Sequence, residues 1–110
     1  MNVQLIDQSR TIVAAAQMAD QGGYYGGTID LASTPPELRA LFDEFEGAVN
    51  DQIFPYADEI QGKIDSFGIR ALFGDGFETE VKDLQVFPST GDVSFRLAGA
   101  LAHTVKTASI

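Results

Sequence analysis

The sequence predicts one α+β domain in which a β-hairpin, two helices and a β-meander follow one another. The helices are expected to pack on one face of a mainly antiparallel sheet. Three observations predict this class: apolar residues recur at helical spacing over residues 35–67, strand-like alternation lies on both sides of that segment, and strands do not alternate singly with helices. A chain of 110 residues fits a single domain spanning 1–110.

A β-hairpin is expected near the start of the chain. The segment from Ile12 to Met18 suits a helix by its consecutive alanines and a strand by its alternation. The turn signal Asp20-Gln21-Gly22-Gly23 and the strand-like segment from Tyr24 to Leu31 favour the strand. Gly26 and Gly27 lie inside the second strand, where glycine indicates a bulge or a close approach of backbones.

Two amphipathic helices are expected over residues 35–67. Thr34-Pro35-Pro36-Glu37 has the pattern of a helix start, with Thr34 as the cap and Glu37 closing a capping box. One unbroken helix would be about 50 Å long, against a domain diameter of about 35 Å. We therefore expect a break between Gly47 and Pro55, with Asn50 or Asp51 as the second cap. One long kinked helix is the alternative.

The meander is expected after Gly68, which ends the second helix in the left-handed conformation. Alternating apolar residues predict strands over 69–73, 77–87 and 93–97, with turns at 74–76 and 88–91. Residues 98–110 are weakly patterned and are expected to be either a frayed tail or an extra edge element.

Composition disfavours several classes of partner. The chain has 16 Asp and Glu against 7 Lys and Arg, a net charge of −9, so no nucleic acid and no membrane surface is expected as a partner. The apolar stretch from Ile12 to Ala19 is too short to cross a bilayer, and Asp7 precedes it where a signal peptide needs positive charge. A cytoplasmic protein is the resulting expectation. There is no cysteine, hence no disulfide or thiolate chemistry.

Three blocks of the sequence resemble small uncharacterised bacterial proteins that have the same block order. The blocks are Tyr25-Gly26-Gly27-Thr28-Ile29-Asp30-Leu31, Pro35-Pro36-Glu37-Leu38-Arg39 with Leu41-Phe42, and Asp83-Leu84-Gln85-Val86 with Pro88-Ser89-Thr90-Gly91 and Val93-Ser94-Phe95. The resemblance spans about residues 24–97 and implies no activity, cofactor or catalytic residue.

No pattern of residues predicts an enzyme, a cofactor or a metal site. His103 is the single histidine and lies in the expected tail, and no cysteine is available to join it at a zinc ion. Asp75, Glu78, Glu80 and Asp83 lack the ligand order of a calcium loop. We expect no catalytic residue, no cofactor and no metal.

The candidate contact residues belong to two features. Glu37, Glu44, Asp51, Asp58 and Asp65 recur every seven residues and so share one side of a helix. This is either a solvated face or an acidic docking strip for a basic protein partner. Tyr24 and Tyr25 lie between glycine pairs and form either an aromatic contact surface or an ordinary turn with one tyrosine buried.

The leading functional hypothesis is a small acidic, non-catalytic protein that acts by self-association or by binding a protein partner. A homodimer is expected, because an open sheet with helices on one face leaves its other face and its edges uncovered. The alternative is a small-molecule binding module, with an apolar pocket between helices and sheet lined by Phe42, Phe45, Phe73 and Phe95.

Overall fold

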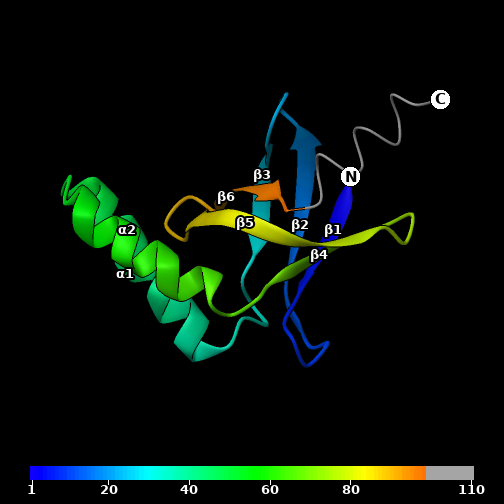
Figure 1. Ribbon diagram of the computed structural model, residues 1–110, viewed down its shortest axis with the longest axis horizontal. Coiled ribbons are helices and arrows are strands. Elements are labelled where there is room, and N and C mark those ends of the chain that lie inside the picture. The colour runs from blue at the N-terminus through cyan, green and yellow to red at the C-terminus, as the bar shows by residue number, and fades with distance from the viewer. Residues whose placement is uncertain (99–110) are drawn as a thin grey trace.

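In the computed structural model, which describes residues 1–98, the strands close into an antiparallel barrel and two helices form a hairpin beside it (Figure 1). The order around the barrel is β1-β2-β3-β6-β5-β4, with β4 next to β1. The elements are β1 (Asn2–Ile6), β2 (Ile12–Asp20), β3 (Tyr25–Asp30), α1 (Pro36–Asn50), α2 (Phe54–Asp65), β4 (Arg70–Phe73), β5 (Glu78–Phe87) and β6 (Asp92–Leu97).

The predicted open sheet is wrong, because β1 pairs along both of its edges. Val3 lies opposite Ala16 of β2 on one side and Phe73 of β4 on the other, and β3 pairs with β6 across the far side. The hairpin and the meander are thereby joined into one closed sheet. The alternation of residues 2–6 is too short to predict a strand from the sequence, and without that strand the barrel cannot close.

The two predicted helices and the break between them are confirmed. Both helices lie against β5 and share one core with the inward side chains of the barrel (Figure 1). Phe42 and Ile60 are 1% and 0% exposed. The far end of the helical hairpin points away from the barrel.

The predicted helix caps are wrong. Pro35 is the N-cap of α1 and Ile53 that of α2, and neither makes a side-chain capping bond. Proline has no N–H, so Pro35 and Pro36 remove donors that a capping side chain would otherwise satisfy. The Thr34 hydroxyl instead donates to the carbonyl of Val13 at 2.6 Å and ties the start of α1 to β2.

Both glycine predictions are confirmed. Gly68 has a φ of 64° three residues after the end of α2 at Asp65, and a Cβ there would lie 2.4 Å from Nε2 of Gln8. Gly27 is the close approach between β2 and β3, since a Cβ built on it would lie 1.8 Å from the carbonyl oxygen of Gln17. Any side chain at Gly27 therefore forces these two strands apart.

We expect Gly27→Ala to destabilise the fold by about 2–3 kcal/mol, because the added methyl group meets backbone that cannot move away without breaking the β2–β3 ladder. Gly62→Ala is the control, since Gly62 faces open space on α2, and it should be neutral or stabilise by up to about 1 kcal/mol. Urea denaturation measures both variants. Equal free energies of unfolding for the two would contradict the strand packing.

A cluster of three charges joins the β1–β2 loop to strands β4 and β5. One carboxylate oxygen of Glu78 accepts from Nη1 of Arg10 and from Nε of Arg70, both at 2.7 Å. The hydrogen bonds from Arg10 and Arg70 lower the pKa of Glu78 from 4.5 to about 2. The folded state therefore favours the ionised carboxylate.

Because the pKa of Glu78 is lowered on folding, the ionised carboxylate stabilises the folded state. This contribution to the free energy of unfolding is complete above about pH 4.5 and is lost as the pH falls toward about 2. Glu78→Gln should be less stable than the wild type at pH 7, and the difference should close over that interval. Thermal unfolding at a series of pH values measures it. A difference that stays constant from pH 7 to pH 2 would show that the carboxylate charge plays no part.

Candidate interaction surface

The structure folds the heptad series of carboxylates back on itself. Glu44 lies on α1, Asp51 in the loop, and Asp58 on α2, all in the half of the hairpin that points away from the barrel (Figure 1). Glu37 starts α1 and Asp65 ends α2, both at the barrel end. The five carboxylates therefore do not form one strip, and only the middle three surround the end of the hairpin.

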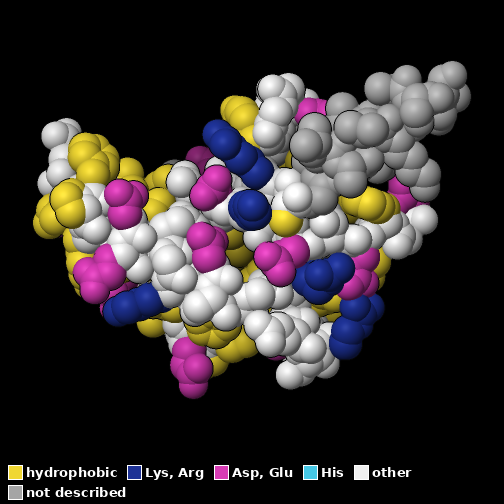
Figure 2. Space-filling model, viewed as in Figure 1, with side chains coloured by type: hydrophobic (Ala, Val, Ile, Leu, Met, Phe, Trp, Pro, Cys, Tyr) yellow, Lys and Arg dark blue, Asp and Glu magenta, His cyan; other side chains and the backbone are white. Residues whose placement is uncertain are grey.

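That end of the hairpin exposes large apolar side chains. We call Ile53, Phe54 and Tyr56 the tip patch; they are 50%, 57% and 42% exposed. Beneath them the small residues Ala48 and Ala57 are buried where the two helices approach each other. Hydrophobic surface gathers at this end of the molecule, with acidic side chains beside it (Figure 2).

The loop before α2 directs these side chains outward. Gln52 takes a positive φ of 59°, which reverses the chain between the helices, and the N–H of Ile53 then donates to the carbonyl of Ala48 at 2.9 Å. Phe54 and Pro55 form the first turn of α2, where proline is tolerated. All of residues 51–56 are exposed, so the apolar run is not needed by the core.

Negative charge surrounds the tip patch. Residues 40–62 contain no Lys or Arg and hold six acidic residues. Asp43 pairs with Arg39 at 3.6 Å, and Glu46 accepts from the Ser89 hydroxyl of the β5–β6 turn at 2.6 Å. The acidic residues toward the tip patch are therefore Glu44, Asp51, Asp58 and Glu59. The Tyr56 hydroxyl donates to Oε2 of Glu44 at 3.0 Å. This bond and the charge of Glu44, with a smaller effect of Glu59, raise the pKa of Tyr56. The Tyr56 ring thus lies at the surface with its hydroxyl bonded to Glu44.

Tyr24 and Tyr25 lie on the barrel, around the turn between β2 and β3, and not on the hairpin. The ring of Tyr25 packs against Phe73 and Phe95, with centroid distances of 5.6 and 5.9 Å. Its partial burial raises the pKa of its hydroxyl. Tyr24 is 47% exposed. Tyr25 is thus partly buried and Tyr24 lies outside, so the two rings do not form one exposed aromatic surface.

The four phenylalanines proposed to line an apolar pocket are core residues. Phe42, Phe45, Phe73 and Phe95 are all buried. Phe45 packs near Phe87, 6.0 Å between ring centroids, while Phe73 and Phe95 pack around Tyr25. All four side chains belong to one packed core and leave no pocket of the kind proposed among them.

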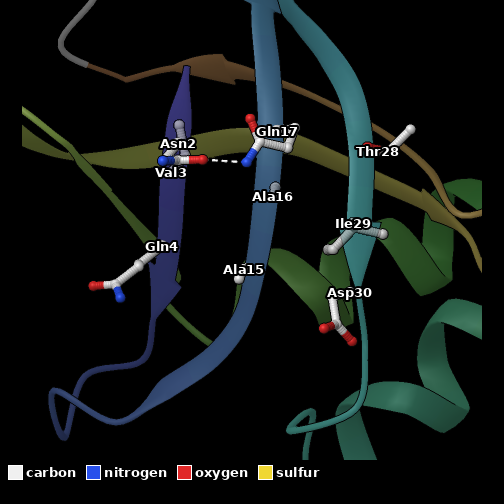
Figure 3. Close-up of a pocket in the computed structure, with 9 residues that line it drawn as sticks. All are labelled: Asn2, Val3, Gln4, Ala15, Ala16, Gln17, Thr28, Ile29 and Asp30. Atoms are coloured by element: carbon white, nitrogen blue, oxygen red, sulfur yellow. Dashed lines mark hydrogen bonds between the residues drawn. The ribbon is translucent and has the colours of Figure 1, made fainter.

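A shallow groove of about 500 Å³ crosses the outer face of β1, β2 and β3 (Figure 3). Two rows of side chains, each running across the three strands, border it. One row consists of Asn2, Gln17 and Thr28, and the other of Gln4, Ala15 and Asp30. The amide of Gln17 donates to the side-chain oxygen of Asn2. Gln4 and Asp30 point away from each other, so the groove has polar walls without converging groups.

Within residues 1–98 no three His, Cys, Asp or Glu side chains are placed to hold a metal ion, and no helix is long and apolar enough to cross a bilayer. His103 lies outside the described residues. Comparison with protein-family models, with curated proteins and with solved structures finds no match.

Sequence reasoning missed the tip patch although two signals were present. Ile53-Phe54-Pro55-Tyr56 places four apolar residues in succession at the helix break, and the surrounding 23 residues from 40 to 62 lack any Lys or Arg. Its helical spacing predicts that Ile53 lies on the buried face of the second helix, because spacing alone does not reveal that the chain turns outward there.

A second group of carboxylates lies where α2 meets β5. Asp65 accepts from Nε2 of Gln61 at 3.1 Å, and the same nitrogen donates to the carbonyl of Leu84 at 3.0 Å. Burial raises the pKa of Asp65, the charges of Asp83 and Glu80 raise it further, and the Gln61 bond opposes them. The ionised form of Asp65 is therefore disfavoured on folding.

A carboxyl group whose pKa rises on folding starts to cost stability as the pH rises above its unfolded pKa, and the cost is complete above its folded pKa. We expect Asp65→Asn, which keeps an acceptor for Gln61 and removes the charge, to be slightly more stable than the wild type at pH 7. The gain should disappear as the pH falls below the ordinary value of 3.8. Thermal melts at pH 7 and pH 3 measure it, and an Asn variant less stable at pH 7 would contradict the assignment.

Proposed function

We propose that this protein is a non-catalytic interaction module that binds a basic protein partner through the tip patch of its helical hairpin. The observation that carries the proposal is the tip patch itself: Ile53, Phe54 and Tyr56 are about half exposed at the end of a hairpin that points away from the barrel. A contiguous apolar surface rimmed by polar groups is typical of a binding site.

The energetics of the tip patch suit an anchor. Burying a side chain such as Ile or Phe contributes about 1.5–3 kcal/mol, and aromatic residues dominate binding energy at many interfaces. Phe54 is the most exposed of the three and Tyr56 is held in place by Glu44. The fitting partner therefore has an apolar pocket that receives Phe54.

The negative charge around the tip patch indicates which residues should surround the apolar pocket of the partner. Four acidic residues, Glu44, Asp51, Asp58 and Glu59, lie toward the tip of the hairpin, and the nearest basic residues in the sequence are Arg39 and Lys63. Lys and Arg around the pocket complement this field and accelerate association at low salt.

The same charge disfavours self-association through the tip patch, since two copies would bring their acidic residues together. The homodimer was expected because an open sheet leaves a face and edges uncovered, and the closed barrel takes that reason away. A heterologous basic partner is the proposal, and a homodimer is one outcome of the test.

We expect Phe54→Ala to weaken binding of the partner by at least tenfold, as truncation of a central aromatic anchor costs about 2 kcal/mol or more. The experiment compares proteins captured from an extract of the native host by wild type and variant, followed by titration of the purified partner. Ile12→Ala is the matched control, because Ile12 is 44% exposed on the barrel. It should leave binding unchanged.

Salt provides a second readout, since binding of a basic partner should weaken as ionic strength rises. Two results would contradict the proposal: a partner of acidic composition, or equal loss of binding in both variants. Sedimentation equilibrium covers the remaining case. A dimer of the 11.8 kDa chain that Phe54→Ala dissociates would show that the tip patch binds a second copy instead.

A further inference from the structure

A small hollow of about 180 Å³ lies on the barrel between the β2–β3 turn and the outer face of β5 and β6. It is smaller than the ~300–1,000 Å³ of sites for drug-sized ligands, so its occupant must be a small molecule. Its lining includes both signs of charge, an aromatic ring, a hydroxyl and an amide. The lining residues are Tyr24, Asp83, Gln85, Ser94, Phe95 and Arg96.

Glycine creates one wall of this hollow. Gly26 of β3 lies opposite Ser94 of β6, and its missing side chain leaves the outer face open there. The side chains of Gln21 and Tyr24 lie over that position, since a Cβ on Gly26 would lie 3.4 Å from Cγ of Gln21 and 3.5 Å from Cε2 of the Tyr24 ring. Gly22 and Gly23 have φ of 82° and 131° and form the turn that returns the chain to Tyr24.

A bulge in β5 creates the opposite wall. The β5–β6 register shifts between Lys82 and Gln85, and Asp83 takes a φ of 53°, which an L residue rarely adopts. The Asp83 carboxylate thereby lies 3.9 Å from Nε of Arg96, and both side chains stay exposed, at 53% and 68%. The backbone is distorted around an ion pair that is loose and open to water, which stabilises a fold very little.

We propose that this hollow binds a small zwitterion, an α-amino acid or a molecule of the same chemistry, between Arg96 and Asp83. The carboxylate of the ligand accepts from the Arg96 guanidinium, and its ammonium group donates to Asp83. The Tyr24 ring packs against the remainder of the ligand, while Ser94 and Gln85 offer further hydrogen bonds. The proposal is independent of the tip patch, which lies on the helical hairpin.

The surrounding charges support this orientation. Lys82 does not line the hollow but lies opposite Arg96 in the β5–β6 register, so a second cation is next to the residue that binds the carboxylate end of the ligand. Asp83 is close enough to Asp65 to raise the pKa of Asp65, so two carboxyl groups lie near the ammonium end of the ligand. A ligand with a single charge is attracted at one end and repelled at the other, whereas a zwitterion is attracted at both.

The test is a nuclear magnetic resonance titration of the full chain, labelled with ¹⁵N and ¹³C, with the free amino acids one at a time up to about 10 mM. At least one should shift the signals of Tyr24, Ser94 and Arg96 with saturation. Two analogues of that amino acid serve as controls: the amine that lacks the carboxylate and the carboxylic acid that lacks the ammonium group. Each should bind at least tenfold more weakly than the amino acid.

Two variants complete the test. Arg96→Gln should weaken binding of the same amino acid at least tenfold. Arg39→Gln is the matched control, because Arg39 forms a comparable exposed pair with Asp43 at 3.6 Å on α1, away from the hollow, and it should leave binding unchanged. The spectrum of each variant shows directly that it is folded. The proposal is overturned if no amino acid shifts these signals, or if the analogue without the ammonium group binds as tightly as the amino acid. It is also overturned if Arg96→Gln and Arg39→Gln change the affinity equally.

Discussion

The pairing of β1 along both of its edges is the constraint on which the rest of the structure depends. Five residues, Asn2–Ile6, join β2 to β4 and turn a hairpin and a meander into one closed barrel. Closure leaves no free strand edge among the described residues and turns one face of every strand inward. Binding surfaces must then lie on the outer face of the barrel or on the helices, and the tip patch, the groove and the hollow do so.

The helical hairpin contributes to the core at one end and to the surface at the other. Near the barrel, Phe42, Ile60 and Ile64 are buried against strand side chains. Farther out, Ala48 and Ala57 keep the helices close together with little apolar bulk, and the large residues Ile53, Phe54 and Tyr56 face water. A fold selected for stability alone gains nothing from that exposure, so the proposed function assigns these side chains to a partner.

The tip patch and the hollow differ in chemistry although the chain is acidic throughout. The tip patch lies beside Glu44, Asp51, Asp58 and Glu59, and it suits a large partner of opposite charge. The hollow lies where Arg96, one of the seven basic residues, pairs with Asp83, with Lys82 opposite Arg96 in the strand register. Its mixed charge and small volume suit a compact ligand with two charges. The two surfaces can therefore be tested separately, by Phe54→Ala and by Arg96→Gln.

The sequence by itself determined the local elements of this protein: two helices with a break before Pro55, the left-handed Gly68 after α2, the close approach at Gly27, and the meander. These depend on spacing and on the freedom of single residues, which are properties of short segments. Only the tertiary structure decided the closed barrel, the hydroxyl bond from Thr34 to Val13, and the meeting of Tyr24 with Asp83 and Arg96. Each of these joins residues far apart in the chain, and such pairings depend on which strands find each other, which periodicity does not encode.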